Sequence, residues 1–133
     1  MSLVVDTDVA SFVFKRDTRD ALYIPHLSGH MLTISFQTLG ELELWTLASG
    51  WGTRRREQLA RYLKRFIVEH SSTALCRRWA EVMDDGRRRG RPIAPADAWS
   101  AATALLLDVP LVTHNAGDYA GVAGLTIISE TQA

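Results

Sequence analysis

Short apolar runs rich in branched residues alternate along the chain with longer segments whose apolar positions recur at helical spacing. The short runs predict five strands, over residues 3–5, 31–35, 66–68, 111–113 and 125–129. The run at 66–68 also fits the end of a helix, and the strand over 125–129 is expected at an edge of the sheet. The longer segments predict helices over 37–48, 53–66, 75–86 and 95–108, with weaker patterns over 8–16 and 17–23. This alternation predicts an α/β fold, a three-layer α/β/α domain with a parallel sheet of about five strands.

The length of 133 residues fits one compact unit, so we expect a single domain over 1–133. The longest apolar stretch, 98–107, is about half the length that a membrane span needs. An apolar run without a basic leader precedes Asp6, which is typical of a strand and not of a signal peptide. One cysteine, Cys76, cannot form an internal disulfide and fits a reducing compartment. We therefore expect a cytoplasmic protein that has no membrane segment.

The formal net charge of zero hides an uneven distribution of charge along the chain. Residues 54–91 carry twelve basic and five acidic side chains, whereas the remaining segments carry three basic and ten acidic ones. Such a separation indicates a charged partner or substrate, although solvated helix faces also explain it.

Acidic and amide side chains follow the predicted strands. Asp6 ends the first strand, Asn115 and Asp118 follow the fourth, Glu41 lies one turn into the helix after the second, and Asp97 lies in the first turn of the buried helix over 95–108. Ligands of open α/β sheets bind outside the carboxyl ends of the strands, so we expect four carboxylates to converge there. Each acid alone also fits a helix cap or a helix-dipole role, but four acids at one edge need a common cause.

Mutual repulsion of the carboxylates supplies that cause. Two carboxylates about 5 Å apart repel by roughly 3 kcal/mol at an effective dielectric constant near 20. A cluster of them must take up protons, spread apart or bind a cation, and an all-oxygen ligand set suits Mg²⁺ or Mn²⁺ rather than zinc. Such an ion activates water and stabilises the leaving oxygen of a phosphodiester, so metal-assisted phosphodiester hydrolysis is the predicted reaction class.

Four motifs follow one another along the chain: Val4-Val5-Asp6-Thr7-Asp8-Val9; Ser35 with Thr38, Glu41 and Leu42; Ile93 with Ala96, Asp97 and Ala98; and Leu111-Val112-Thr113-His114-Asn115 with Asp118 and Tyr119. A single Asp-Thr-Asp after a strand is unspecific, whereas the ordered set is specific. From Leu3 to Ile128 the chain resembles the PIN-domain ribonucleases, and among them the VapC-type (FitB-like) toxins of bacterial toxin–antitoxin pairs.

The resemblance implies Mg²⁺-dependent endonucleolytic cleavage of RNA, a homodimer, and inhibition by a cognate antitoxin whose tail lies over the active site. It implies that Asp6, Glu41 and Asp97 are the three principal acids and that Asp118 is a fourth, more variable acid. It also implies that Thr7 and Asn115 are supporting polar residues. Asp6 and Asp97 are then the main metal ligands, Glu41 holds or orients a water molecule, and Asp118 completes the site. His114 receives no role and is expected at the surface.

Arginine clusters and tryptophans suggest further surfaces. We expect RNA contacts from the arginines whose loop leads to Asp97, namely Arg87, Arg88, Arg89 and Arg91, because guanidinium groups bind phosphate in a bidentate manner. The helix face of Arg54, Arg61 and Arg65 is a weaker candidate that also fits a solvated surface. Trp45 and Trp79 are expected in the core, whereas Trp51 and the segment 36–51 are candidates for a dimer or antitoxin surface.

Two other functions remain open. A haloacid-dehalogenase-like phosphotransferase would use Asp6 as nucleophile and Asp8 as acid, but it also needs a lysine at a strand end, and the only lysines are Lys15 and Lys64. A non-catalytic PIN-like module that binds nucleic acid or protein is the other alternative, because a fold does not determine a function.

Overall fold

The computed structural model describes residues 1–131, and it contains a five-stranded sheet in which every neighbouring pair of strands is parallel. The strand order is β3-β2-β1-β4-β5. The strands are β1 (Ser2–Val5), β2 (Met31–Ser35), β3 (Phe66–Glu69), β4 (Leu111–Val112) and β5 (Ile127–Ile128). The predicted parallel sheet and α/β fold class are therefore confirmed.

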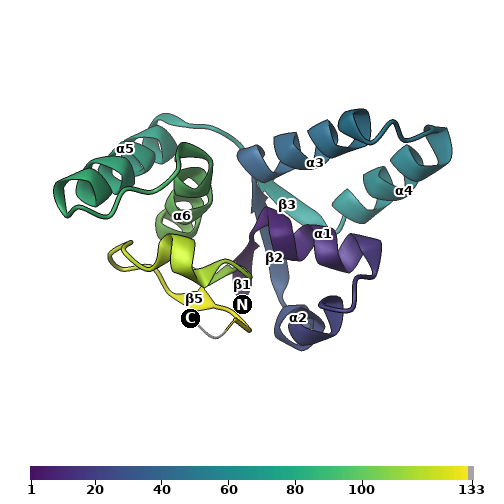
Figure 1. The fold of residues 1–133 in the computed structure, drawn as a ribbon, viewed down its shortest axis with the longest axis horizontal. Helices are drawn as coiled ribbons and strands as arrows, with labels where there is room; N and C mark the ends of the chain where they lie inside the picture. Colours follow the sequence, from purple (N-terminus) through teal and green to yellow (C-terminus); the bar gives the residue numbers. More distant parts are fainter. Residues whose placement is uncertain (132–133) are drawn as a thin grey trace.

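Helices cover both faces of this sheet (Figure 1). The helices are α1 (Thr7–Lys15), α2 (Asp20–Leu27), α3 (Phe36–Ala48), α4 (Thr53–Leu63), α5 (Thr73–Arg88) and α6 (Pro95–Leu107), followed by a short 3₁₀ helix, η1 (Ala116–Tyr119). The connections from β1 to β2 and from β2 to β3 place α1 to α4 on one side, and the return from β3 to β4 places α5 and α6 on the other.

Side chains that alternate along β1 divide the core into two parts. Leu3 and Val5 face a cluster formed with α1 to α4, whereas Val4 faces a cluster formed with α5, α6 and Tyr119. This is the period of two expected of a strand that is buried on both faces. It is the physical basis of the predicted α/β/α layering.

Several predicted boundaries differ from the structure. The helix predicted over 53–66 ends at Leu63, and Phe66 begins β3, because its side chain is buried against the core beside β2. The weak helix predicted over 17–23 begins later, at Asp20, and the strand predicted over 125–129 shortens to two residues.

The aromatic residues singled out from the sequence lie partly buried. Trp45 and Trp79 pack against the two core clusters, in agreement with their predicted place. Trp51 does not project into solvent as a free surface, since its ring lies 4.6 Å from that of Trp45 and 5.8 Å from that of Phe14. Within residues 1–131, no helix combines the length and the apolar character needed to cross a bilayer.

Candidate metal centre

The site lies where the order of the strands reverses. The chain leaves β1 towards β2 on one side, whereas β4 pairs with β1 on the other, so a crevice opens at the carboxyl ends of β1 and β4. Asp6 follows β1 directly, and Thr113 follows β4 directly. The topology therefore places the first of the predicted acids at the position where open α/β sheets bind their ligands.

Hydrogen bonds hold the Asp6 carboxylate in place. Asp6 is only 8% exposed and caps α1, its Oδ1 accepting from the backbone N–H of Thr7 at 2.9 Å. Its Oδ2 accepts from the hydroxyls of Thr113 at 2.8 Å and Tyr119 at 2.9 Å. The Ser100 hydroxyl lies 3.4 Å from Oδ1. These donors stabilise a carboxylate that burial alone would disfavour.

Tyr119 joins two of the acids. Its buried hydroxyl lies 2.9 Å from Asp6 Oδ2 and 3.5 Å from Asp97 Oδ1, and its single proton can serve only one of them at a time. The shorter distance assigns the proton to Asp6. The contact brings the start of α6 and the end of β1 together through one side chain.

The four predicted acids converge on one region. Burial raises the pKa of the Asp97 carboxyl to about 6, and the charges of Asp6, Asp118 and Glu41, in decreasing order, raise it further. The carboxylates therefore lie close enough to repel one another, as the placement of their elements at the sheet edge predicts. Glu41 also accepts a hydrogen bond from Gln37 at 3.3 Å, whereas Glu43 is exposed.

The donor set fits a hard divalent ion in its chemistry. All four candidate ligands are carboxylates, and crowding of their charges favours a bound cation. Among the residues described, no three His, Cys, Asp or Glu side chains are grouped closely enough to hold an ion as they stand. Binding an ion there therefore requires rotation of the less buried carboxylates, Glu41, Asp97 and Asp118, towards the fixed Asp6.

Asp8 and the supporting residues fasten the loops around the site. Asp8 Oδ2 accepts from the backbone N–H of His114 at 2.9 Å and from Asn115 Nδ2 at 3.1 Å, so the Asn115 amide contacts Asp8. Thr7 donates its hydroxyl to the Thr38 hydroxyl at 2.9 Å and so ties α1 to α3. Burial first, and then the charge of Asp6, raise the pKa of Asp8 to about 6.

His114 is half-buried rather than exposed, contrary to the prediction. Its Nδ1 lies 2.6 Å from the hydroxyl of Tyr23, and its ring packs edge-on against Phe12 at 5.3 Å. These contacts connect the segment after β4 to α1 and α2.

The arginines predicted to bind RNA are mostly paired within their own helix. Arg87 and Arg88 contact Asp84 at 2.6 Å and 3.0 Å, and Arg89 contacts Asp85 at 3.1 Å. Arg91 forms no ion pair with any residue of 1–131, and its side chain lies beside Gly121. RNA binding by these residues stays a prediction, and three of their four charges are already compensated.

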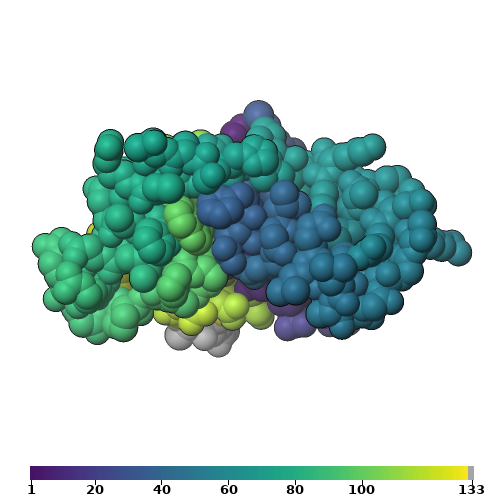
Figure 2. Space-filling model, turned by 90° about the horizontal axis from the view of Figure 1, so that it is seen from above, coloured from purple at the N-terminus to yellow at the C-terminus, as the bar shows by residue number. Residues whose placement is uncertain are grey.

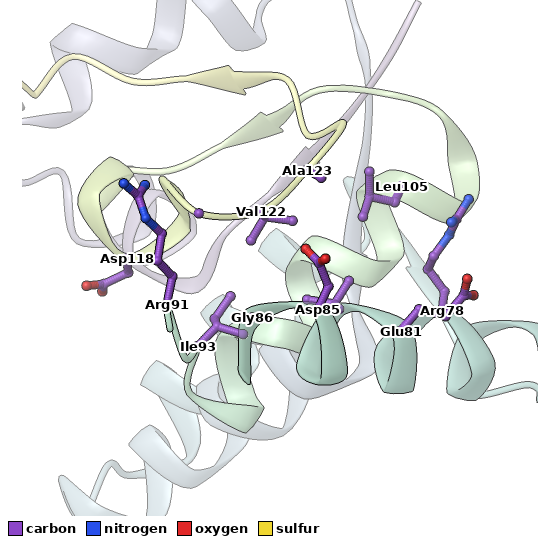
Figure 3. Close-up of a pocket in the computed structure, with 12 residues that line it drawn as sticks. Arg78, Glu81, Asp85, Gly86, Arg91, Ile93, Leu105, Asp118, Val122 and Ala123 are labelled. Atoms are coloured by element: carbon purple, nitrogen blue, oxygen red, sulfur yellow. The ribbon is translucent and has the colours of Figure 1, made fainter. Parts of the chain in front are cut away.

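A hollow of about 150 Å³ between α5, α6 and the segment after η1 adjoins the acids (Figure 3). Arg91 and Asp118 stand at its rim, and the Asp118 carboxylate points away from Asp85 and Glu81. Asp118 is exposed, whereas Asp6 is buried.

Asp97 gives the metal-free protein a specific pH dependence. A carboxyl with a pKa raised to about 6 binds its proton more tightly in the folded chain than in the unfolded one, where its value is 3.8. The stability that this proton provides is lost as the pH rises from about 4 to about 6. We expect the melting temperature in EDTA to fall over that range and to fall less steeply in Asp97→Asn.

Asp8, whose pKa is also about 6, contributes to the slope of both proteins, so some pH dependence should persist in the variant. Thermal unfolding followed by circular dichroism at pH 4 to 7 measures both slopes. Equal slopes in the wild type and Asp97→Asn would show that the folded environment does not perturb Asp97.

Sequence reasoning missed the hydroxyl groups that fix Asp6. Thr113 and Tyr119 stand in the fourth motif, but only the acid and the amide of that motif were assigned roles. The available signal was a polar residue directly after a strand, since Thr113 follows β4 as Asp6 follows β1. The role of Tyr119 depends on how η1 folds back towards β1, which no local pattern indicates.

Together, the strand order, the layers and the acidic crevice define a three-layer α/β domain with a candidate cation site at its topological switch point. The sequence profile described as the PIN domain matches residues 3–125, and the chain belongs to this family.

Known proteins resemble the chain over nearly its full length. It is 26% identical to Ribonuclease VapC1 of Haemophilus influenzae (strain R2866), over 94% of this chain and 95% of that protein. Its fold is similar to that of a chain in the structure of VapBC2 from Rickettsia felis bound to a promoter DNA fragment, with a TM-score of 0.85 and 18% identity. This match covers 98% of the present chain and 100% of the other. A chain of a toxin–antitoxin complex from Klebsiella pneumoniae matches with a TM-score of 0.75 and 20% identity, over 98% of the present chain and 99% of the other. The structural likenesses show a shared fold.

Proposed function

We propose that the chain is a Mg²⁺-dependent endoribonuclease and the toxin of a type II toxin–antitoxin pair. The observation that carries the proposal is the placement of Asp6, Glu41 and Asp118 around Asp97 at the β1/β4 crevice of a PIN domain, where burial, and then the charges of these three acids, raise the pKa of Asp97. The similarity to a protein named as a ribonuclease supports the same reaction class.

The same four acids would hold the ion, with Mn²⁺ as a substitute for Mg²⁺. When bound, such an ion activates water for attack on phosphorus and neutralises charge that develops on the phosphate. Thr113, Tyr119 and Thr7 keep the Asp6 carboxylate in one orientation before the ion arrives. Asp97 must release its proton to act as a ligand, so tighter binding of Mg²⁺ is expected as the pH rises through about 6.

A cleavage assay tests the proposal directly. A labelled RNA incubated with the purified chain should be cut internally in Mg²⁺ or Mn²⁺ and remain intact in EDTA. Restoring excess Mg²⁺ after EDTA should restore cutting. RNA that stays intact in Mg²⁺ would favour the non-catalytic binding module, and equal cutting in EDTA would exclude the metal mechanism.

The partner proposal follows from the same family. We propose a cytoplasmic homodimer that is inhibited by a cognate antitoxin, and the outer surface of α3 is a candidate interface. Leu44 and Leu47 of this helix are 62% and 65% exposed, and α3 and α4 form much of one side of the molecule (Figure 2). Gel filtration of the chain without its antitoxin should give twice the monomer mass, and a monomer would exclude the dimer.

The phosphotransferase alternative fits the structure poorly. Its proton donor, Asp8, already accepts two hydrogen bonds from His114 and Asn115. That chemistry also needs a later pair of acids at a strand end, but Asp84 and Asp85 lie on α5 and form ion pairs with arginines at the end of this helix.

A further inference from the structure

A basic groove lies between the C-terminal end of α1 and α4. Both helices lie on the side of the sheet that carries α3 (Figure 1). The groove encloses about 680 Å³, and no acidic residue is among the described residues that line it. Its cations are Lys15 at the end of α1, Arg16 directly after it, Arg55 and Arg61 on α4, and Arg65 just beyond the end of α4. The groove is thus a concentrated positive region outside the acidic site.

These cations differ from the arginines at the end of α5. None of the five forms an ion pair within residues 1–131, whereas Arg87, Arg88 and Arg89 are all paired with aspartates. The C-terminal ends of α1 and α4 both favour nearby cations, which suits Lys15, Arg16, Arg61 and Arg65. Arg55 lies in the first turn of α4, where the helix dipole disfavours a cation, and the five charges together remain available to an external anion.

Aromatic rings hold part of the cationic set in place. The Arg55 guanidinium lies over the rings of Phe14 at 4.5 Å and Trp51 at 4.9 Å, and Arg65 lies over Tyr62 at 5.6 Å. Stacking uses the face of a guanidinium and leaves N–H donors at its edge available for phosphate oxygens. One Arg55 N–H already donates to Gln58 at 3.2 Å, so its remaining donors and those of Arg65 are the ones that stacking leaves for phosphate.

The position of the groove suits a strand that also reaches the acids. Helix α1 begins directly after Asp6 and ends at Lys15, so the groove lies roughly 13 Å along the helix axis from the site. Each nucleotide of a stacked strand advances about 3.4 Å along the strand axis, so about four stacked nucleotides span this distance. The carboxylates repel the backbone that they are proposed to cut, and cations elsewhere must supply the affinity.

We propose that this groove binds the phosphate backbone of single-stranded RNA about four nucleotides from the bond at the acidic site. The inference rests on the proposed ribonuclease function and names the surface that holds the substrate. It assigns the main electrostatic contact to α4 and α1, and not to the loop that leads to Asp97.

Binding measured without cleavage tests the groove. Fluorescence anisotropy of a labelled single-stranded RNA of about 20 nucleotides, in EDTA, gives the affinity of the wild type and of the double variant Arg61→Gln/Arg65→Gln. Loss of two phosphate contacts should weaken binding roughly tenfold or more at 0.1 M salt and lower the salt slope by about 1.4. Both arginines are exposed, so the variant should unfold at nearly the wild-type temperature.

The matched control is Arg54→Gln/Arg56→Gln, which removes the same charge from α4 at exposed positions outside the groove lining. It should retain nearly all of the affinity and salt dependence. Equal losses in both variants, or none in either, would overturn the groove proposal. Binding of labelled polyglutamate is measured in the same way. If the groove variant binds RNA as the wild type does but no longer binds polyglutamate, the groove binds an acidic protein segment, and the RNA proposal is overturned as well.

The two proposals fail separately. If the wild type cuts RNA in Mg²⁺ and the groove variant binds RNA as the control does, the groove is wrong and the ribonuclease function stands. If RNA binds through the groove and is never cut in Mg²⁺, the ribonuclease function is wrong and the groove stands.

Discussion

Replacing Asp6 by asparagine is expected to reduce RNA cleavage in Mg²⁺ by roughly 1,000-fold or more while the protein stays folded. Among the four proposed ligands, Asp6 is held from several directions, by Thr7, Thr113 and Tyr119. A divalent ion provides several kcal/mol of transition-state stabilisation, and each 1.36 kcal/mol is a factor of ten in rate. Asparagine keeps the size and one oxygen of the side chain but removes the charge that would hold the ion. Initial rates with a fixed RNA substrate measure the effect.

Asp108→Asn is the matched control for this variant. Asp108 is an exposed residue at the C-terminal end of α6, with φ of 55°, a conformation that asparagine tolerates well. The same chemical change there should leave the cleavage rate and the melting temperature unaltered. Thermal unfolding of Asp6→Asn distinguishes a lost ligand from a lost fold. Cleavage by folded Asp6→Asn at the wild-type rate would refute the mechanism.

The fold could be predicted from the sequence because most elements carry a strong local signal. The β1 run is apolar on both faces, and α6 is apolar nearly all round, as elements inside a three-layer domain must be. The boundary at Phe66 could not be fixed in this way, since its side chain continues the apolar stripe of α4. Pairing of β3 with β2, a contact between distant parts of the chain, decides that residue in favour of a strand.

The position of Asp6 could be predicted because it directly follows a strand, and the carboxyl ends of parallel strands share one edge of the sheet. The hydrogen bond from Tyr119 to Asp6 could not, because the two residues are 113 positions apart. The pairing of Arg87 and Arg88 with Asp84 was present in the sequence as spacings of three and four on a helix. The expectation that Arg87 to Arg91 bind RNA rests on the loop that leads to Asp97, and it does not take these spacings into account.

Gly86→Ala is expected to lower the free energy of unfolding by about 1–3 kcal/mol. Gly86 is buried near the end of α5, where an added Cβ would lie 2.8 Å from the carbonyl oxygen of Arg91, a backbone atom held by the chain's return towards α6. This clash outweighs the gain in helix propensity of about 1 kcal/mol. Gly40→Ala in α3 is the control, because its Cβ meets nothing within 4 Å, and it should raise stability by about 0.5–1 kcal/mol. Urea denaturation of both variants measures the difference, and equal stabilisation by both would show that the α5–α6 connection yields freely to the added methyl group.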